Sequence, residues 1–236
     1  MFPLRDTVPS RTFPVVTWAL IVLNTAVFFF EASLPPQAQQ ALIERYGFVP
    51  ARLFGGEAPL WGVITLFTSM FLHGGWFHLF SNMWALYIFG DNVEDRMGPG
   101  RYFVFYILSG LSAALLQGVL MPTSHVPMVG ASGAISGVLG AYFLFFPTSR
   151  VITWVPIFLF FGTYIDVPAV FYLAMWFFTQ LYSGLFSLSL PQGMQGGGVA
   201  WWAHVGGFVF GLLFARAFVP PYQRQRKWYP DEYWPW

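Results

Sequence analysis

Ser132 is the residue of this chain best placed to act as a nucleophile. It lies between two glycines in the segment VGASGAISGVLGAYFLFF, residues 129–146, which has an apolar helical pattern. Gly130 allows the backbone to turn closely before the helix. A helix from Ser132 to Phe146 is roughly 22 Å long, whereas the hydrocarbon core of a bilayer is about 30 Å thick. We therefore expect Ser132 to lie within the depth of a membrane.

The small residues around Ser132 also allow a purely structural interpretation. Gly133, Gly137 and Gly140 share one helix face, which predicts close contact with another helix. Serine is itself common where membrane helices touch, so a single GxSG segment does not establish catalysis. A catalytic serine requires a base and an oxyanion-binding group at the same depth.

His204 is the candidate base. It lies in WWAHVGGFVFG, where Ala203, Gly207, Gly211 and Ala215 form a stripe of small residues at helical spacing. That stripe would let the helix approach the glycine face beside Ser132, and a neutral imidazole there could accept the hydroxyl proton. Asp166 is the only acid between Asp95 and Asp231, and we expect it at the inner side. The residues therefore favour a serine–histidine dyad over a triad, with a packing histidine as the alternative.

His78 and Asn82 are candidates for stabilising negative charge. They are four residues apart, so on a helix they share one face and point hydrogen-bond donors into the same space. The first turn of the Ser132 helix would add backbone N–H groups. His73 is too far around the helix to complete a metal site with them, and we expect neither metal nor cofactor. We expect His125, in a loop between prolines, to be exposed to solvent.

The composition indicates a polytopic membrane protein. Hydrophobic residues make up 56% of the chain, aromatic residues 21% and charged residues only 9%. The chain has no cysteine, which excludes disulfides and a thiol nucleophile. A net charge of +1 gives no sign of nucleic-acid binding. The lipid bilayer is thus the partner that the composition itself predicts.

Six apolar ranges are long enough, or apolar enough, to be membrane spans. We expect all-α architecture, with residues 1–12 as an N-terminal segment, 13–220 as the membrane domain and 221–236 as a basic and aromatic tail. The runs 60–72 and 151–161 are too short to cross, so we expect them to be interfacial or re-entrant. Residues 34–60 and 191–198 are predicted loops. The six predicted spans are residues 13–34, 74–89, 102–121, 132–146, 169–190 and 199–219.

The distribution of cations predicts the orientation. With six spans, nine Arg and Lys residues fall on the side of the two termini, and only Arg45 and Arg52 fall opposite. Cytoplasmic loops carry the excess of Arg and Lys, so both termini are predicted to be cytoplasmic.

The chain resembles the rhomboid family of intramembrane serine proteases. The resemblance rests on four segments in one order: HGGWFHLFSN with His73, His78 and Asn82; VEDRMG with Glu94; GASG around Ser132; and AHVGGFVFG with His204. It covers about residues 60–219. It implies a six-helix bundle in the cell (inner) membrane, a Ser132–His204 dyad and oxyanion support from His78 and Asn82. It also implies supporting roles for His73, Gly130, Gly133, Ala203, Gly207 and Gly211, and cleavage of transmembrane helices of other membrane proteins near their outer end.

Two positions depart from the family pattern. Members often carry an aromatic residue four positions after the nucleophile, under the histidine ring, where this chain has Ser136. A Trp-Arg pair found in many members is Trp61-Gly62 here. The alternatives to a protease are an inactive rhomboid-like binding factor and a small transporter, although internal repeats typical of transporters are not evident.

Overall fold

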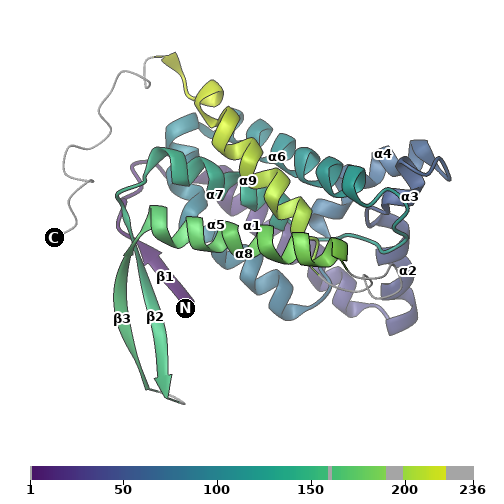
Figure 1. Cartoon of the computed structure of the whole chain (residues 1–236), viewed down its shortest axis with the longest axis horizontal. Helices are drawn as coiled ribbons and strands as arrows, with labels where there is room; N and C mark the ends of the chain where they lie inside the picture. The colour runs from purple at the N-terminus through teal and green to yellow at the C-terminus, as the bar shows by residue number, and fades with distance from the viewer. Residues whose placement is uncertain (1, 159–160, 190–198, 222–236) are drawn as a thin grey trace.

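The computed structural model describes residues 2–158, 161–189 and 199–221. The chain is mainly helical, with a small antiparallel sheet at one end (Figure 1). The helices are α1 Val15–Ser33, α2 Pro36–Tyr46, α3 Pro50–Leu53, α4 Pro59–Thr68, α5 Trp76–Met97, α6 Pro99–Leu120, α7 Ser132–Phe145, α8 Ala169–Ser189 and α9 Trp201–Phe218, with a 3-10 turn η1 at Ser69–Phe71. The strands are β1 Phe2–Asp6, β2 Arg150–Phe158 and β3 Phe161–Pro168.

A helix lies at each of the six predicted ranges, namely α1, α5, α6, α7, α8 and α9. Among the described residues, α1, α6, α8 and α9 are long and apolar enough to cross a membrane. α5 qualifies together with the α4–η1 segment, and the two are bent by 78°. α7 is apolar but has only 14 residues, as its short apolar run predicts. The molecule is therefore a multi-pass membrane protein with four or five candidate spans in the described part of the chain.

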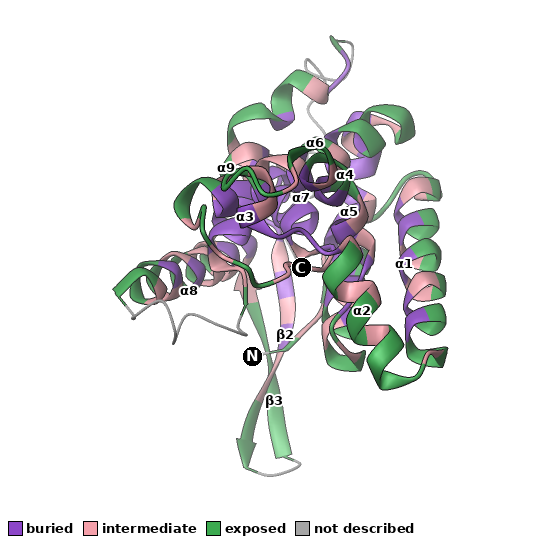
Figure 2. Ribbon diagram, turned by 90° about the vertical axis from the view of Figure 1, so that its right-hand side faces the viewer, coloured by how far each residue is buried: buried purple, intermediate pink, exposed green. Residues whose placement is uncertain are grey.

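α7 is the centre of the bundle. Every residue from Gly133 to Tyr142 is buried, whereas only a few residues of α1 and α8 are (Figure 2). A helix that is apolar all round either lies in a protein core or faces lipid, and α7 lies in the core of this bundle. The glycines permit this, because a side chain at Gly137 would collide with Ser109 of α6, and one at Gly140 would collide with the backbone of α9.

Two carboxylates on α5 hold the beginning of α1. Glu94 accepts hydrogen bonds from the N–H groups of Val16 at 2.9 Å and Thr17 at 2.8 Å. Asp95 accepts from the N–H groups of Arg11 at 2.5 Å and Thr12 at 3.1 Å. The first turn of a helix leaves N–H groups without intrahelical partners, and carboxylates suit its positive end. The acidic last turns of α5 therefore fix α1 against the bundle.

Two of the predictions made from the sequence are wrong. The range 34–60, predicted as a loop, contains the helices α2 and α3, each beginning at a proline. The all-α prediction misses a three-stranded sheet in the order β1-β2-β3. The apolar run 151–161 falls on β2 and the beginning of β3, which pair from Arg150↔Pro168 to Phe158↔Phe161. The predicted loop 191–198 and nearly all of the tail 221–236 lie outside the described residues.

Candidate active site

Ser132 is the first residue of α7, directly after a glycine turn. Gly130 has a φ of 123°, which L side chains rarely adopt, and its N–H donates to the carbonyl oxygen of Ser69 at 2.9 Å. A side chain at Gly130 would lie 2.6 Å from Nε2 of His78. Gly130 is thus required both for the turn and for the approach of His78 to the beginning of α7.

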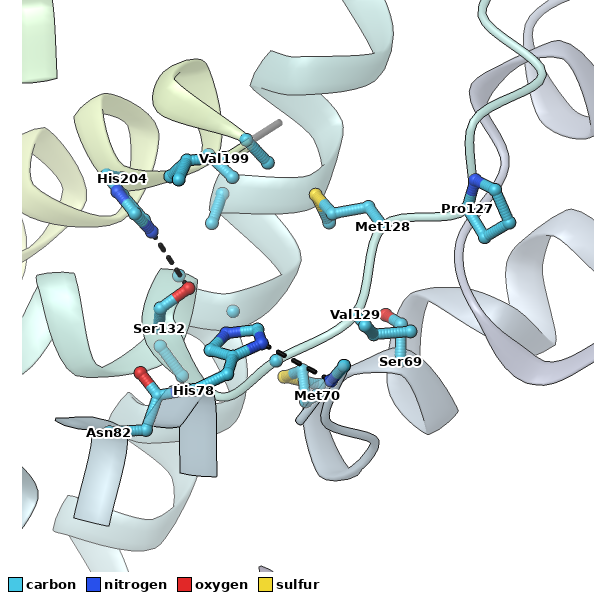
Figure 3. Close-up of a pocket in the computed structure, with 18 of the residues that line it drawn as sticks. Ser69, Met70, His78, Asn82, Pro127, Met128, Val129, Ser132, Val199 and His204 are labelled. Atoms are coloured by element: carbon cyan, nitrogen blue, oxygen red, sulfur yellow. Dashed lines mark hydrogen bonds between the residues drawn. The ribbon is translucent and has the colours of Figure 1, made fainter. Parts of the chain in front are cut away.

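His204 on α9 meets Ser132 across the interface between α7 and α9. Its Nε2 lies 2.8 Å from Oγ of Ser132 (Figure 3). The helices touch through their backbones, since side chains at Gly207 and Gly211 would collide with the carbonyl oxygens of Gly133 and Gly137. The predicted contact between the two small-residue faces is confirmed, and it brings His204 within hydrogen-bond distance of Ser132.

Gln180 on α8 is a site residue that the sequence reasoning missed. Its Oε1 lies 2.7 Å from Nδ1 of His204. Its amide nitrogen donates to the carbonyl oxygen of Trp176 at 3.3 Å and to Oγ1 of Thr179 at 3.0 Å, which fixes the orientation of the amide. Oε1 can only accept, so Nδ1 of His204 carries a proton and the neutral ring leaves Nε2 free to accept. The sequence offered one signal for Gln180, because a glutamine within a largely apolar predicted span is costly to bury and often functional.

Ser136 occupies the position at which an aromatic residue often lies under the histidine ring. In this chain two tryptophans from other positions lie beside the ring of His204 instead. The ring of Trp176 on α8 has its centroid 5.9 Å from that of His204, and the ring of Trp201 is 6.3 Å away. Ser136 instead donates to the carbonyl oxygen of Ser132 at 2.6 Å. Two aromatic side chains therefore restrict the imidazole from α8 and from the beginning of α9.

His78 and Asn82 share one face of α5, as their spacing predicts, and both line the same cavity as Ser132 (Figure 3). The N–H of Gly74 donates to Nδ1 of His78 at 3.4 Å, so Nε2 of His78 is left as the ring's proton-bearing atom. The amide nitrogen of Asn82 has no hydrogen-bond partner among the described residues. Two side-chain donors thus lie close to Gly130 and the first turn of α7.

His73 lies behind this arrangement and does not line the cavity. It is fully buried, its backbone N–H donates to Oε2 of Glu31 at 3.2 Å, and its ring centroid lies 5.2 Å from that of His78. His125 lies apart from the site, with a side chain 71% exposed and an ion pair to Glu57 at 2.8 Å. The prediction that His125 is a surface residue is confirmed.

The cavity that contains Ser132 and His204 has a volume of about 730 Å³. Its lining comes from α2, η1, α5, α6, α7, the segment before α7 and the beginning of α9. We call the end of the bundle that holds this cavity the cavity end, and the other the opposite end. A serine, a neutral histidine and several hydrogen-bond donors therefore converge in one cavity inside a multi-pass membrane protein.

These features define a helical membrane protein with a serine–histidine pair at a buried helix contact. The model of the rhomboid domain matches residues 60–221, which is more than half of the chain and includes every residue of this pair and its donors. The chain belongs to the rhomboid family.

Relatives include proteases and a protein described as inactive. YdcA of Bacillus subtilis is 33% identical over 132 residues, which cover 56% of this chain and 62% of YdcA. The rhomboid protease GluP of Bacillus subtilis is 31% identical over 54% of this chain and 24% of GluP. Inactive RHOMBOID-like protein 8 of Arabidopsis thaliana is 34% identical over 42% of this chain and 27% of the relative. The chain spans less than two thirds of the length of the curated relatives it matches.

Proposed function

We propose that this chain is an intramembrane serine endopeptidase that cleaves transmembrane segments of other membrane proteins. The observation that carries the proposal is the 2.8 Å contact between Oγ of Ser132 and Nε2 of His204, with Nδ1 of the same ring against Gln180. A serine hydroxyl becomes a nucleophile when a neutral imidazole takes its proton, and this geometry provides that acceptor.

The reaction follows from the positions of the two side chains. Oγ of Ser132 attacks the carbonyl carbon of the scissile peptide while its proton passes to Nε2 of His204. The C–N bond of the tetrahedral intermediate then breaks as His204 returns that proton to the leaving amine, which leaves an acyl group on Ser132. A water molecule gives a proton to Nε2 and attacks the acyl carbon. The bond from that carbon to Oγ then breaks as His204 returns the proton to Ser132, which restores the serine hydroxyl and releases the carboxyl product.

The oxyanion would be stabilised at the beginning of α7. The first-turn N–H groups of the helix have no intrahelical partners, and the positive end of the helix dipole favours negative charge there. Nε2 of His78 and the unpaired amide nitrogen of Asn82 add two side-chain donors. These donors surround the position that a carbonyl oxygen would occupy beside Ser132.

We propose that the chain has six membrane spans and lies in the cell (inner) membrane with both termini in the cytoplasm. The nine-to-two distribution of cations supports it, and so do the six helices at the predicted ranges. The site then lies near the outer face, where it would meet the outer end of a substrate helix. Reporter fusions in α2 should read external and fusions after Arg101 cytoplasmic, and the reverse result would reject this orientation.

An inactive, substrate-binding relative is the second candidate, since one similar protein is described as inactive. A catalytically dead protein does not require an aligned serine and histidine, and both are present here at hydrogen-bond distance. A transporter would use the same cavity without a covalent step. Both alternatives predict that Ser132 does not react with electrophiles.

A fluorophosphonate probe distinguishes these candidates, used on the purified chain in lipid nanodiscs. The wild-type chain should be labelled, whereas Ser132→Ala should not. Ser136→Ala is the matched control, since Ser136 lies one turn further along the same helix, and it should be labelled like the wild type. The same samples should be assayed with a single-span membrane protein as substrate. Labelling without any cleavage across a panel of such substrates would reject the protease proposal, and no labelling of the wild type would reject Ser132 as the nucleophile.

A further inference from the structure

The β2–β3 hairpin leaves the bundle and exposes a strongly apolar tip. It projects away from the helices in both views (Figures 1 and 2). The exposed fractions are 72% for Ile157, 68% for Phe158, 76% for Phe161 and 68% for Tyr164. No charged residue occurs from Val151 to Ile165. Such a surface is costly in water, so it calls for an apolar or interfacial partner.

Contacts of β1 show in which direction the hairpin runs. At one end of β1, Asp6 accepts a hydrogen bond at 2.8 Å from Asn92, near the end of α5. At the other end, the carbonyl oxygen of Pro3 accepts from Nε1 of Trp84 at 2.7 Å. Trp84 precedes Asn92 by eight residues, which is about 12 Å along a helix. Followed from Asp6 to Pro3, β1 therefore lies along α5 from the end of that helix toward its middle.

β2 continues in this direction beyond the end of β1. Phe2 pairs with Trp154 in the antiparallel ladder, and β2 extends four residues further to Phe158, or about 13 Å. The strand pair therefore turns back from the opposite end of the bundle toward the membrane. A strand pair that only entered the aqueous phase would point away from the bundle at the opposite end.

The hairpin is also continuous with a lipid-facing surface. The ring of Phe2 stacks on Phe80 with centroids 6.4 Å apart and on Trp84 at 5.7 Å. Phe80 is 51% exposed and Tyr87 48% exposed on the same helix. In a multi-pass membrane protein, exposed aromatic side chains on a spanning helix face lipid. This aromatic row leads through Phe2 and its pair Trp154 to Tyr164, the partner of Trp154 on β3.

We infer that the tip of the β2–β3 hairpin, with its exposed Ile157, Phe158 and Phe161, inserts into the lipid leaflet beside α5. The depth is limited by the backbone. Among the described residues β3 forms an edge of the sheet, so its outward N–H and C=O groups have no strand partner there, and such an edge is not tolerated in the hydrocarbon centre. The occupant is lipid, and the hairpin is an interfacial membrane anchor.

Single cysteines can test the depth directly, because the native chain contains none. Phe161→Cys and Tyr164→Cys would each carry a nitroxide label in the full-length protein, reconstituted in phosphatidylcholine–phosphatidylglycerol nanodiscs that hold one copy. Gln37→Cys in α2 is the water control, and Leu213→Cys, 65% exposed on α9, is the hydrocarbon control. Collision rates with oxygen and with a water-soluble nickel chelate report the depth of each label.

Both hairpin labels should show an oxygen-to-nickel ratio several-fold above that of Gln37→Cys and at or below that of Leu213→Cys. A ratio equal to that of Gln37→Cys at both positions would overturn the inference. Protection that arises only after adding a substrate protein, or only when two copies share a disc, would overturn it too and would make the tip a protein-binding surface. Ile157→Cys replaces either variant that fails to give a folded protein by circular dichroism.

Discussion

The amide oxygen of Gln180 and Nδ1 of His204 are 2.7 Å apart, so the imidazole is held from α8 while it faces Ser132 on α7. The carboxylate of a serine–histidine–aspartate triad does this with a negative charge. Here a neutral amide fixes the tautomer and the ring orientation, without a charge that would have to be buried in the membrane.

Gln180→Met should lower kcat by roughly 10- to 100-fold and leave KM nearly unchanged, because a buried hydrogen bond of about 1–3 kcal/mol is lost. Gln180→Glu keeps an acceptor at the same place and should restore part of kcat, with a pH–rate profile displaced from that of wild type. Steady-state kinetics with a single-span substrate measure both. A Gln180→Met variant with wild-type kcat and an unchanged pH profile would reduce Gln180 to a packing residue.

Ser132→Ala and His204→Ala should each abolish cleavage in a protein that remains folded. The double variant should be no slower than either single variant, because residues that act as one unit are not additive. Cleavage assays with purified variants, normalised to the folded fraction, check this. Proteolysis that persists in pure Ser132→Ala would contradict the assignment.

His78→Ala and Asn82→Ala should slow turnover by about 10²- to 10³-fold while Ser132 still reacts slowly with a fluorophosphonate. The backbone donors of α7 remain in both variants, so residual activity is expected. Melting temperature and turnover must be measured together. If Asn82→Ala melted earlier but kept the wild-type rate per folded molecule, its role would be to join α5 to its neighbours.

Gly207→Ala should lower both stability and activity, because its new methyl group collides with the carbonyl oxygen of Gly133 and forces α9 away from α7. Overpacking of this kind costs about 1–3 kcal/mol. Gly100→Ala is the matched control, since a side chain there meets nothing within 4 Å. Thermal unfolding in detergent should separate the two variants, and equal stability would show that the helix contact is looser than the structure indicates.

Asp6 should make stability depend on pH. Its Oδ2 accepts from Tyr142 at 2.5 Å and from Asn92 at 2.8 Å, and burial of the carboxyl group, with the nearby charge of Asp91, raises its pKa from 3.8 to about 8. The folded protein therefore binds an extra proton between these values, and the free energy of unfolding falls as pH rises through about 8. Asp6→Asn should flatten this slope between pH 6 and 9, whereas Asp166→Asn on exposed β3 should retain it.

The geometry of the candidate site was largely predictable because Ser132 and His204 carry strong local signals. Ser132 and His204 each lie in a run of small residues at helical spacing, and the contact between those runs determines their distance. Gln180 could not be found in this way, because nothing around it in sequence indicates which face of α8 meets α9. The β2–β3 hairpin was missed because a short apolar run has the same composition in a strand as in a buried helix.

The order of helices along the chain has a consequence for synthesis in the cell. Ser132 begins α7, but His204 and Gln180 lie on α9 and α8, which emerge from the ribosome later. An unfinished chain that ends before α9 holds a serine hydroxyl with no base beside it, and such a hydroxyl is a weak nucleophile. The serine–histidine pair of the proposed peptidase is therefore complete only when α9, the last described helix, has packed against α7.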